Sequence, residues 1–138
     1  MTDSRFKTLT DHFETVIKAN TDAQAVFSGL QGRGNKKIFV TYGVKSDGDI
    51  NMDANGTIDT KHRVLFVAHS GNYETCDKVI EDILTLWCDT TSATVRTAFS
   101  DAGGLLMTPK NVYYAVKENA PKKQIAAVEF LFTMRTTY

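Results

Sequence analysis

The feature of the sequence that most constrains the fold is a C-terminal segment, Gln124 to Thr136, in which apolar residues recur at every second position. These positions are Ala126, Val128, Phe130, Phe132 and Met134. A period of two is that of a β-strand, and it places all five side chains on one face. The positions between them mix apolar with polar and charged residues, so the opposite face is at most half covered. The segment predicts a strand of a sheet that is buried on one side.

Two segments carry the helical period instead. From about Ser4 to Asn20, and from Tyr73 to about Cys88, apolar residues recur at spacings of three and four. Both segments are long enough to form amphipathic helices with one apolar stripe. Shorter helical turns are expected within 23–30 and within 95–102.

Three further segments are rich in β-branched and aromatic residues and are expected to be strands: 37–44, 57–70 and 105–116. Helices and strands do not alternate regularly along the chain. We therefore expect an α+β fold, with a mainly antiparallel sheet of four to five strands and two helices packed on one face. With 138 residues, no linker and no internal repeat, the chain is expected to form a single domain, 1–138.

The stretch DGDINMDANGTID, residues 47–59, is acidic and contains no basic residue. An EF-hand loop started at Asn51 would have Gly56 at its sixth position, but its twelfth position is His62, which offers no carboxylate. Asn55-Gly56 is typical of a two-residue hairpin turn in which both residues take positive φ. We therefore expect a projecting hairpin near 45–62, with a calcium site as the alternative. The aspartates of this candidate pore or interface loop are Asp47, Asp49, Asp53 and Asp59.

Other candidates for chemistry do not form a recognisable constellation. The glycine-rich segment 29–36 leads into a strand, whereas a phosphate-binding loop leads into a helix N-terminus. His62 and His69 are separated by an odd number of residues in one extended segment, so they point to opposite faces of the sheet. His12 is expected on the polar side of the first helix. We expect no metal site, no catalytic site and no cofactor.

The cysteines and the charge balance indicate in which compartment the protein assembles and which partners it lacks. Cys76 and Cys88 are expected on one helix, about 18 Å apart along its axis, which is too far for a disulfide. The N-terminus has no apolar run typical of a secretory signal, and the longest uninterrupted apolar segment, 64–68, is too short to span a bilayer. Sixteen basic residues balance sixteen acidic ones. We expect assembly in a cytoplasm, with no membrane partner and no sequence-specific nucleic-acid partner.

Three parts of the chain together resemble the tail terminator proteins of long-tailed bacteriophages, and more loosely their neck and tail-completion proteins. They are the amphipathic helix with Phe6 to Ile17, which leads to a hairpin sheet, the strand-then-helix unit 62–84, and the closing strand 126–135. The resemblance is one of layout and covers most of the chain. It implies a structural, non-enzymatic protein of the virion tail or neck that forms a ring, commonly a hexamer, on the end of a finished tail tube. The implied partners are its own copies, the tail tube protein and the head–tail connector or neck proteins.

In such a ring, the acidic hairpin is expected to project into the lumen, where negative charge would keep passing DNA from adhering. Three alternatives stay open. The chain would be another head–tail connector or a tail-tube subunit, a small calcium- or ligand-binding module, or an enzyme built around His69, Ser70 and Cys76. The last lacks a visible third group to orient the base.

Overall fold

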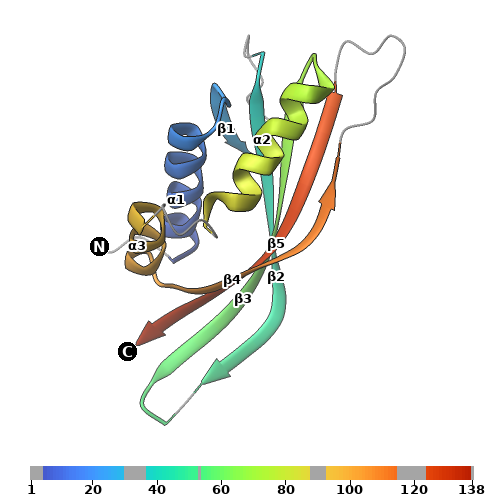
Figure 1. Cartoon of the computed structure of the whole chain (residues 1–138). Helices are drawn as coiled ribbons and strands as arrows, with labels where there is room; N and C mark the ends of the chain where they lie inside the picture. The colour runs from blue at the N-terminus through green and yellow to red at the C-terminus, as the bar shows by residue number, and fades with distance from the viewer. Residues whose placement is uncertain (1–4, 30–36, 53, 88–92, 115–123, 138) are drawn as a thin grey trace.

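The computed structural model describes residues 5–29, 37–52, 54–87, 93–114 and 124–137 (Figure 1). These residues form three helices and one five-stranded sheet, so the expected α+β class is confirmed. In chain order the elements are α1 (Arg5–Asn20), β1 (Ala25–Ser28), β2 (Phe39–Met52), β3 (Thr57–Ser70), α2 (Tyr73–Leu86), α3 (Ala93–Asp101), β4 (Gly104–Tyr113) and β5 (Gln124–Thr137). The strand order is β1-β2-β3-β5-β4, and all neighbours are antiparallel except β1 and β2.

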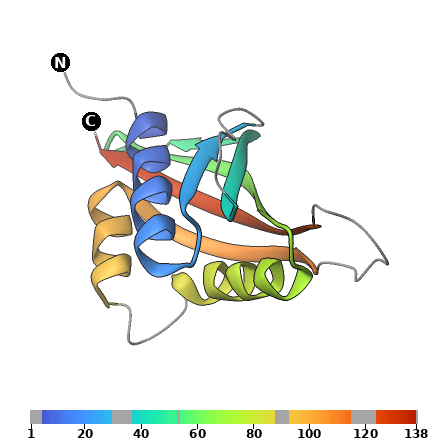
Figure 2. The same ribbon diagram turned by 90° about the horizontal axis from the view of Figure 1, so that it is seen from above.

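The three helices pack on one face of the sheet, as Figure 2 shows from above. The alternation predicted for β5 is confirmed, because its five apolar positions from Ala126 to Met134 are all buried. They lie beside the buried side chains of β2 and β3 in one core with the apolar stripes of the helices. Three helices cover this face rather than the two expected. The opposite face carries no helix from the described part of the chain.

The central pair β3–β5 forms the longest ladder of the sheet. It runs without a register shift from Thr57 opposite Thr137 to Ser70 opposite Gln124. At the end of β3 the chain turns directly into α2, whose N-cap Asn72 accepts a hydrogen bond of 2.8 Å from the Glu74 amide. A side chain that accepts from the first turn satisfies an amide that has no partner within the helix. The predicted extents of β3 and of the start of α2 are therefore confirmed.

Two short elements differ from expectation. The segment expected as a helical turn at 23–30 contains strand β1, because Gln24 and Gly29 donate backbone hydrogen bonds to Ile38 and Tyr42 across the pair with β2. The turn expected within 95–102 is a nine-residue helix, α3. Its apolar side chains Val95 and Phe99 are one helical turn apart and both buried, so packing on the sheet stabilises a sequence with few apolar residues.

The hairpin predicted around the acidic stretch is present, with β2 paired to β3 as far as Met52 opposite Ile58. The predicted two-residue turn is wrong, because Gly56 has φ of 79° whereas no other residue type has positive φ in the described part of the chain, Asn55 included. A loop longer than two residues with glycine at its left-handed position is the alternative connection. The hairpin end lies far from the helices (Figure 1).

The acidic stretch also distorts β2. Ser46 pairs with His62 and Ile50 pairs with Thr60, so the residues 47–49 lie opposite the single residue Lys61. Such a bulge bends the strand and leaves backbone groups unpaired in the ladder. The side chains of residues 46–53 lie outside the described part of the chain.

His12 was expected on the polar side of the first helix, and this expectation is wrong. Its side chain is only 7% exposed, and the Trp87 indole Nε1 donates a hydrogen bond of 3.0 Å to its Nε2. The Phe99 ring of α3 lies 5.7 Å from the imidazole, so the third helix covers the side of α1 that was expected to face solvent. Burial lowers the pKa of His12 to about 4, and the imidazole is therefore neutral near pH 7.

Candidate functional site

The candidate site is the sheet face opposite the helices, which we call the open face. Since side chains alternate along a strand, it carries every second residue of the regular ladders. On β3 these residues are Asp59, Lys61, Arg63, Leu65, Val67 and His69, and their β5 partners are Arg135, Thr133, Leu131, Glu129, Ala127 and Ile125. Because the register is continuous, each pair forms part of a row across the sheet.

One half of the open face, near the start of β5, is aromatic and apolar. The Phe39 ring stacks on the His69 imidazole, with centroids 4.5 Å apart and an interplanar angle of 5°. The Thr41 hydroxyl lies 2.9 Å from His69 Nε2 and fixes the ring. Beside this stack, Ile125 and Tyr113 are 59% and 55% exposed. Large apolar side chains gathered on an exposed face mark interaction surfaces.

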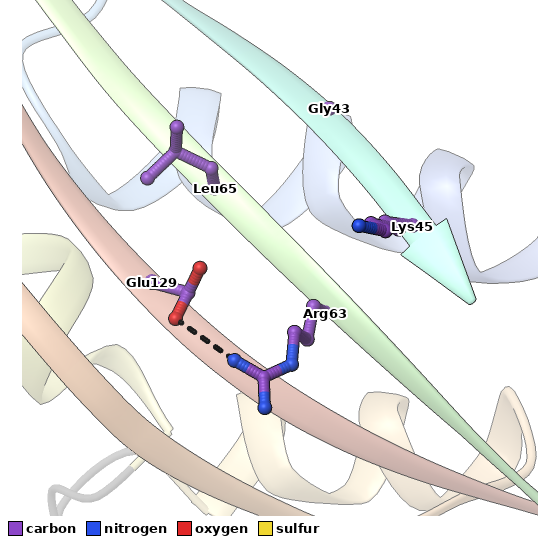
Figure 3. Close-up of a pocket in the computed structure, with 5 residues that line it drawn as sticks. All are labelled: Gly43, Lys45, Arg63, Leu65 and Glu129. Carbon is purple, nitrogen blue, oxygen red and sulfur yellow. Dashed lines mark ion pairs between the residues drawn. The ribbon is translucent and has the colours of Figure 1, made fainter. Parts of the chain in front are cut away.

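The other half of the open face is charged and contains a hollow of about 410 Å³ (Figure 3). It is lined by Gly43, Lys45, Arg63, Leu65 and Glu129. Gly43 has no side chain, and no heavy atom lies within 4 Å of the position that a Cβ would take there, so this point of β2 leaves room above the sheet. The hollow exists because a glycine faces the open side beside longer neighbours.

Cross-strand ion pairs organise the charged half. Figure 3 shows Arg63 of β3 turned toward Glu129 of β5, with Nη1 and Oε1 3.5 Å apart. The Asn111 amide of β4 donates to the same carboxylate oxygen at 3.2 Å. Lys45 lies on β2, on the far side of β3 from Glu129 (Figure 3). The hollow is therefore lined by two cationic side chains, Lys45 and Arg63, and by the carboxylate of Glu129, which is paired with Arg63.

Asp59 is the only one of the four predicted aspartates whose side chain is described. It lies on the open face, where Arg135 donates to both carboxylate oxygens at 2.8 and 2.9 Å from the neighbouring strand. The hydrogen bond from Arg135 lowers the pKa of Asp59. Asp47 and Asp49 belong to the bulged part of β2 and their side chains are not described, while Asp53 lies wholly outside the described residues.

The histidine and cysteine candidates do not converge. His62 and His69 point to opposite faces, as predicted, since they pair with Phe132 of the core and Ile125 of the open face. The Cys76 thiol is buried and donates to the Gln124 carbonyl at 3.3 Å. Burial raises its pKa to about 11, so it is protonated rather than an activated nucleophile.

The described residues contain neither a metal-ligand cluster nor a membrane-spanning helix. Across them, no group of three or more His, Cys, Asp and Glu side chains is placed to hold a metal ion. None of the helices in the part of the chain that the structure covers combines the length and apolarity needed to cross a bilayer. The glycine-rich segment 30–36, weighed as a phosphate loop, and Cys88 lie outside the described residues.

The hollow was not found by sequence reasoning. Lys45, Arg63 and Glu129 come from three strands that are distant in the chain, and only the register brings them together. A usable signal was present in β3, where Arg63, Leu65 and the following alternate positions form a second, less apolar face.

No protein-family model matches the sequence, and no curated protein matches it. Among solved structures, the chain is similar to one from the "Virion of native gene transfer agent (GTA) particle", with a TM-score of 0.47 and 13% sequence identity. The similarity covers 96% of this chain and 92% of that chain. No residue of the open face is assigned a role through it.

Proposed function

We propose that this chain is a structural assembly protein of a phage virion, a tail terminator that forms a closed ring on the end of the tail tube of a long-tailed phage. The observation that carries the proposal is the open face. The sheet is buried by helices on one side, and on the other it exposes Leu65, Tyr113 and Ile125 beside an array of charged side chains. A sheet face of this composition is stabilised when a second layer covers it, and self-assembly supplies that layer.

The proposed ring uses one domain per copy, residues 1–138, and six copies. A ring requires a heterologous contact, in which two different surfaces of each copy meet, and a rotation that closes. The tail tube protein would bind one side of the ring, and the connector or neck proteins the other. The protein would be located in the tail or neck of the virion after assembly in the host cytoplasm, and it would act without cofactor, membrane or sequence-specific nucleic acid.

The acidic hairpin near 45–62 is proposed to line the lumen of the ring. Negative charge there would repel the phosphates of passing DNA. Replacing Asp47, Asp49 and Asp53 by lysine is expected to lower infectivity while rings still form. Unchanged infectivity of that variant would argue against a role in the lumen.

Electron microscopy of the purified chain tests the proposed function against its nearest rival. A terminator gives discrete closed rings of uniform diameter, because its ring presents no surface on which a second identical ring can grow. A tail-tube subunit gives open-ended tubes whose length rises with concentration. If tubes form, the protein is a tail-tube subunit and the terminator proposal is wrong.

An alternative of another class is a small calcium- or ligand-binding module, and the front half of an EF-like pattern at 51–58 favours calcium as its ligand. Calcium at a hundredfold excess over its dissociation constant would stabilise the chain by about 2.7 kcal/mol. We expect no shift of the melting temperature on addition of calcium. A shift that EDTA reverses would support the metal-binding module.

A further inference from the structure

We propose that the charged half of the open face binds the acidic outer side of helix α2 of the next copy. The inference rests on the proposed function, since it takes ring assembly as its starting point and names the two surfaces that meet. The partner that occupies the open face is thus a second copy of this chain, which binds through its helix α2.

The open face is the cationic partner. The Lys, Arg, Asp and Glu side chains described at its positions on β2, β3 and β5 are four cations and two carboxylates, a net charge of +2: Lys45, Lys61, Arg63 and Arg135 against Asp59 and Glu129. Two such faces would repel each other if they met, because like charges opposed at an interface cost several kcal/mol. A symmetric contact between two open faces is therefore disfavoured, and a negative surface elsewhere on the molecule is required.

Helix α2 is the negative surface. Its outer side carries four carboxylates and one lysine, a net charge of −3: Glu74, Asp77, Glu81 and Asp82 with Lys78. Lys78 is 2.9 Å from Asp22 and 3.6 Å from Asp82, so its charge is shared with neighbouring carboxylates. The Tyr114 hydroxyl donates to Glu81 at 2.7 Å, and this bond together with the charges of Glu81 and Asp77 raises the pKa of Tyr114.

The dimensions of the two surfaces agree. Glu74 and Glu81 are seven residues apart and lie about 10 Å from each other along the helix axis. On the open face, the rows of Arg63 and of Asp59 with Arg135 are four residues apart along β3, or about 13 Å. One carboxylate would enter the hollow between Lys45 and Arg63, while the other lies over the row of Arg135, whose guanidinium it would share with Asp59.

The two surfaces lie on opposite sides of one subunit, since α2 belongs to the helical layer and the open face is behind the sheet (Figure 2). Their contact is therefore head-to-tail, the heterologous kind that generates a ring when the rotation closes. It would place a helix of the next copy over the exposed side chain of Leu65 and add a second helical layer on the other side of the sheet.

Two charge-reversed variants of the full chain test the pairing. The open-face variant carries Lys45→Glu and Arg63→Glu, and the helix variant carries Glu74→Lys and Glu81→Lys. Self-association is measured by sedimentation velocity over a range of concentrations. For each variant alone, we expect the dissociation constant of self-association to rise at least about a hundredfold. A control with Lys18→Glu and Arg96→Glu reverses two exposed cations of α1 and α3 and should assemble like the wild type.

Mixing the two variants gives a sharper result. The helix of the open-face variant and the open face of the helix variant are both intact, so one native contact can form. The other contact joins the reversed helix to the reversed open face, which carry opposite charges and are also complementary. We expect the mixture to assemble into rings in which the two variants alternate, and this result also shows that both variants are folded. The fourfold variant with all charges exchanged should assemble again.

The outcomes separate the inference from the proposed function. If the wild type stays monomeric at high concentration, the proposed function fails. If the wild type forms rings and the helix variant forms them equally well, only the pairing is wrong. A mixture that stays monomeric while the wild type assembles also overturns the pairing. The pairing is also overturned if Lys45 and Arg63 are needed for binding of duplex DNA but not for self-association. The open face would then be a nucleic-acid-binding surface.

Discussion

The buried pair of His12 and Trp87 makes the stability of this protein depend on pH in a predictable direction. Trp87 donates to a neutral imidazole at 3.0 Å, and burial lowers the pKa of His12 from 6.5 to about 4. In the unfolded chain the histidine takes up a proton near its ordinary pKa. The unfolded state therefore binds more protons than the folded state between pH 6.5 and 4, and the free energy of unfolding falls as the pH falls through this window.

The size of the effect follows from the two pKa values. At pH 5 the unfolded histidine is almost fully protonated and the folded one is mostly neutral, which costs about 2 kcal/mol of stability relative to pH 7.5. The full loss, reached below pH 4, is about 3 kcal/mol. Because the side chain is only 7% exposed, solvent screens this effect little.

The variant His12→Gln isolates this contribution, because a neutral carboxamide can accept from Trp87 but does not titrate. Urea unfolding of both proteins at pH 7.5 and pH 5 gives the assay. We expect the wild type to lose about 2 kcal/mol more than the variant between these two pH values. The other ionisable groups contribute to both proteins and cancel in the difference. Equal losses in the two proteins would refute the assignment of a neutral, buried His12.

Two further predictions concern packing and reactivity. A Cβ at Gly104 would overlap the Phe99 ring, so Gly104→Ala is expected to lower the free energy of unfolding by about 1–3 kcal/mol in urea titrations. The matched change Gly43→Ala meets nothing within 4 Å and should leave stability unchanged or raise it by up to about 1 kcal/mol. Since burial raises the pKa of Cys76 to about 11, iodoacetamide at pH 8 should alkylate Cys76 on the order of a hundredfold more slowly in the native protein than in urea, as read by peptide mass spectrometry.

The elements with a strong local period were predicted well from the sequence. Strand β5 has an apolar residue at every second position, and α2 has an apolar stripe that includes Ile80 and Ile83, so local geometry alone decides which side is buried. Strand β3 was predicted with its observed bounds, Thr57–Ser70, because β-branched residues and turn signals coincide there.

The elements that were missed depend on contacts between distant residues. Strand β1 has only four residues and is a strand because β2 provides a parallel partner, which the local sequence does not encode. Helix α3 is stabilised by placing Phe99 against Phe132, with ring centroids 5.7 Å apart. The helical period places His12 on the polar side of α1, but α3 packs against that side and buries it. Tertiary packing overrides local preference in all three cases.

The candidate site was harder to predict than the fold for the same reason. The sequence predicts the candidate site in the acidic stretch 47–59. The structure instead brings together Lys45, Arg63 and Glu129 from three different strands. Their juxtaposition is fixed by strand register, and register is set by pairing across the whole sheet. Of the predicted aspartates, Asp59 does belong to the open face, where it is held by Arg135.

Native mass spectrometry of the purified full chain tests the central claim, that this protein works by assembling copies of itself into a ring. The claim predicts one discrete mass that corresponds to a closed oligomer, with six copies as the expected number, and no open series of larger species. A single-chain mass that persists at high protein concentration would contradict it.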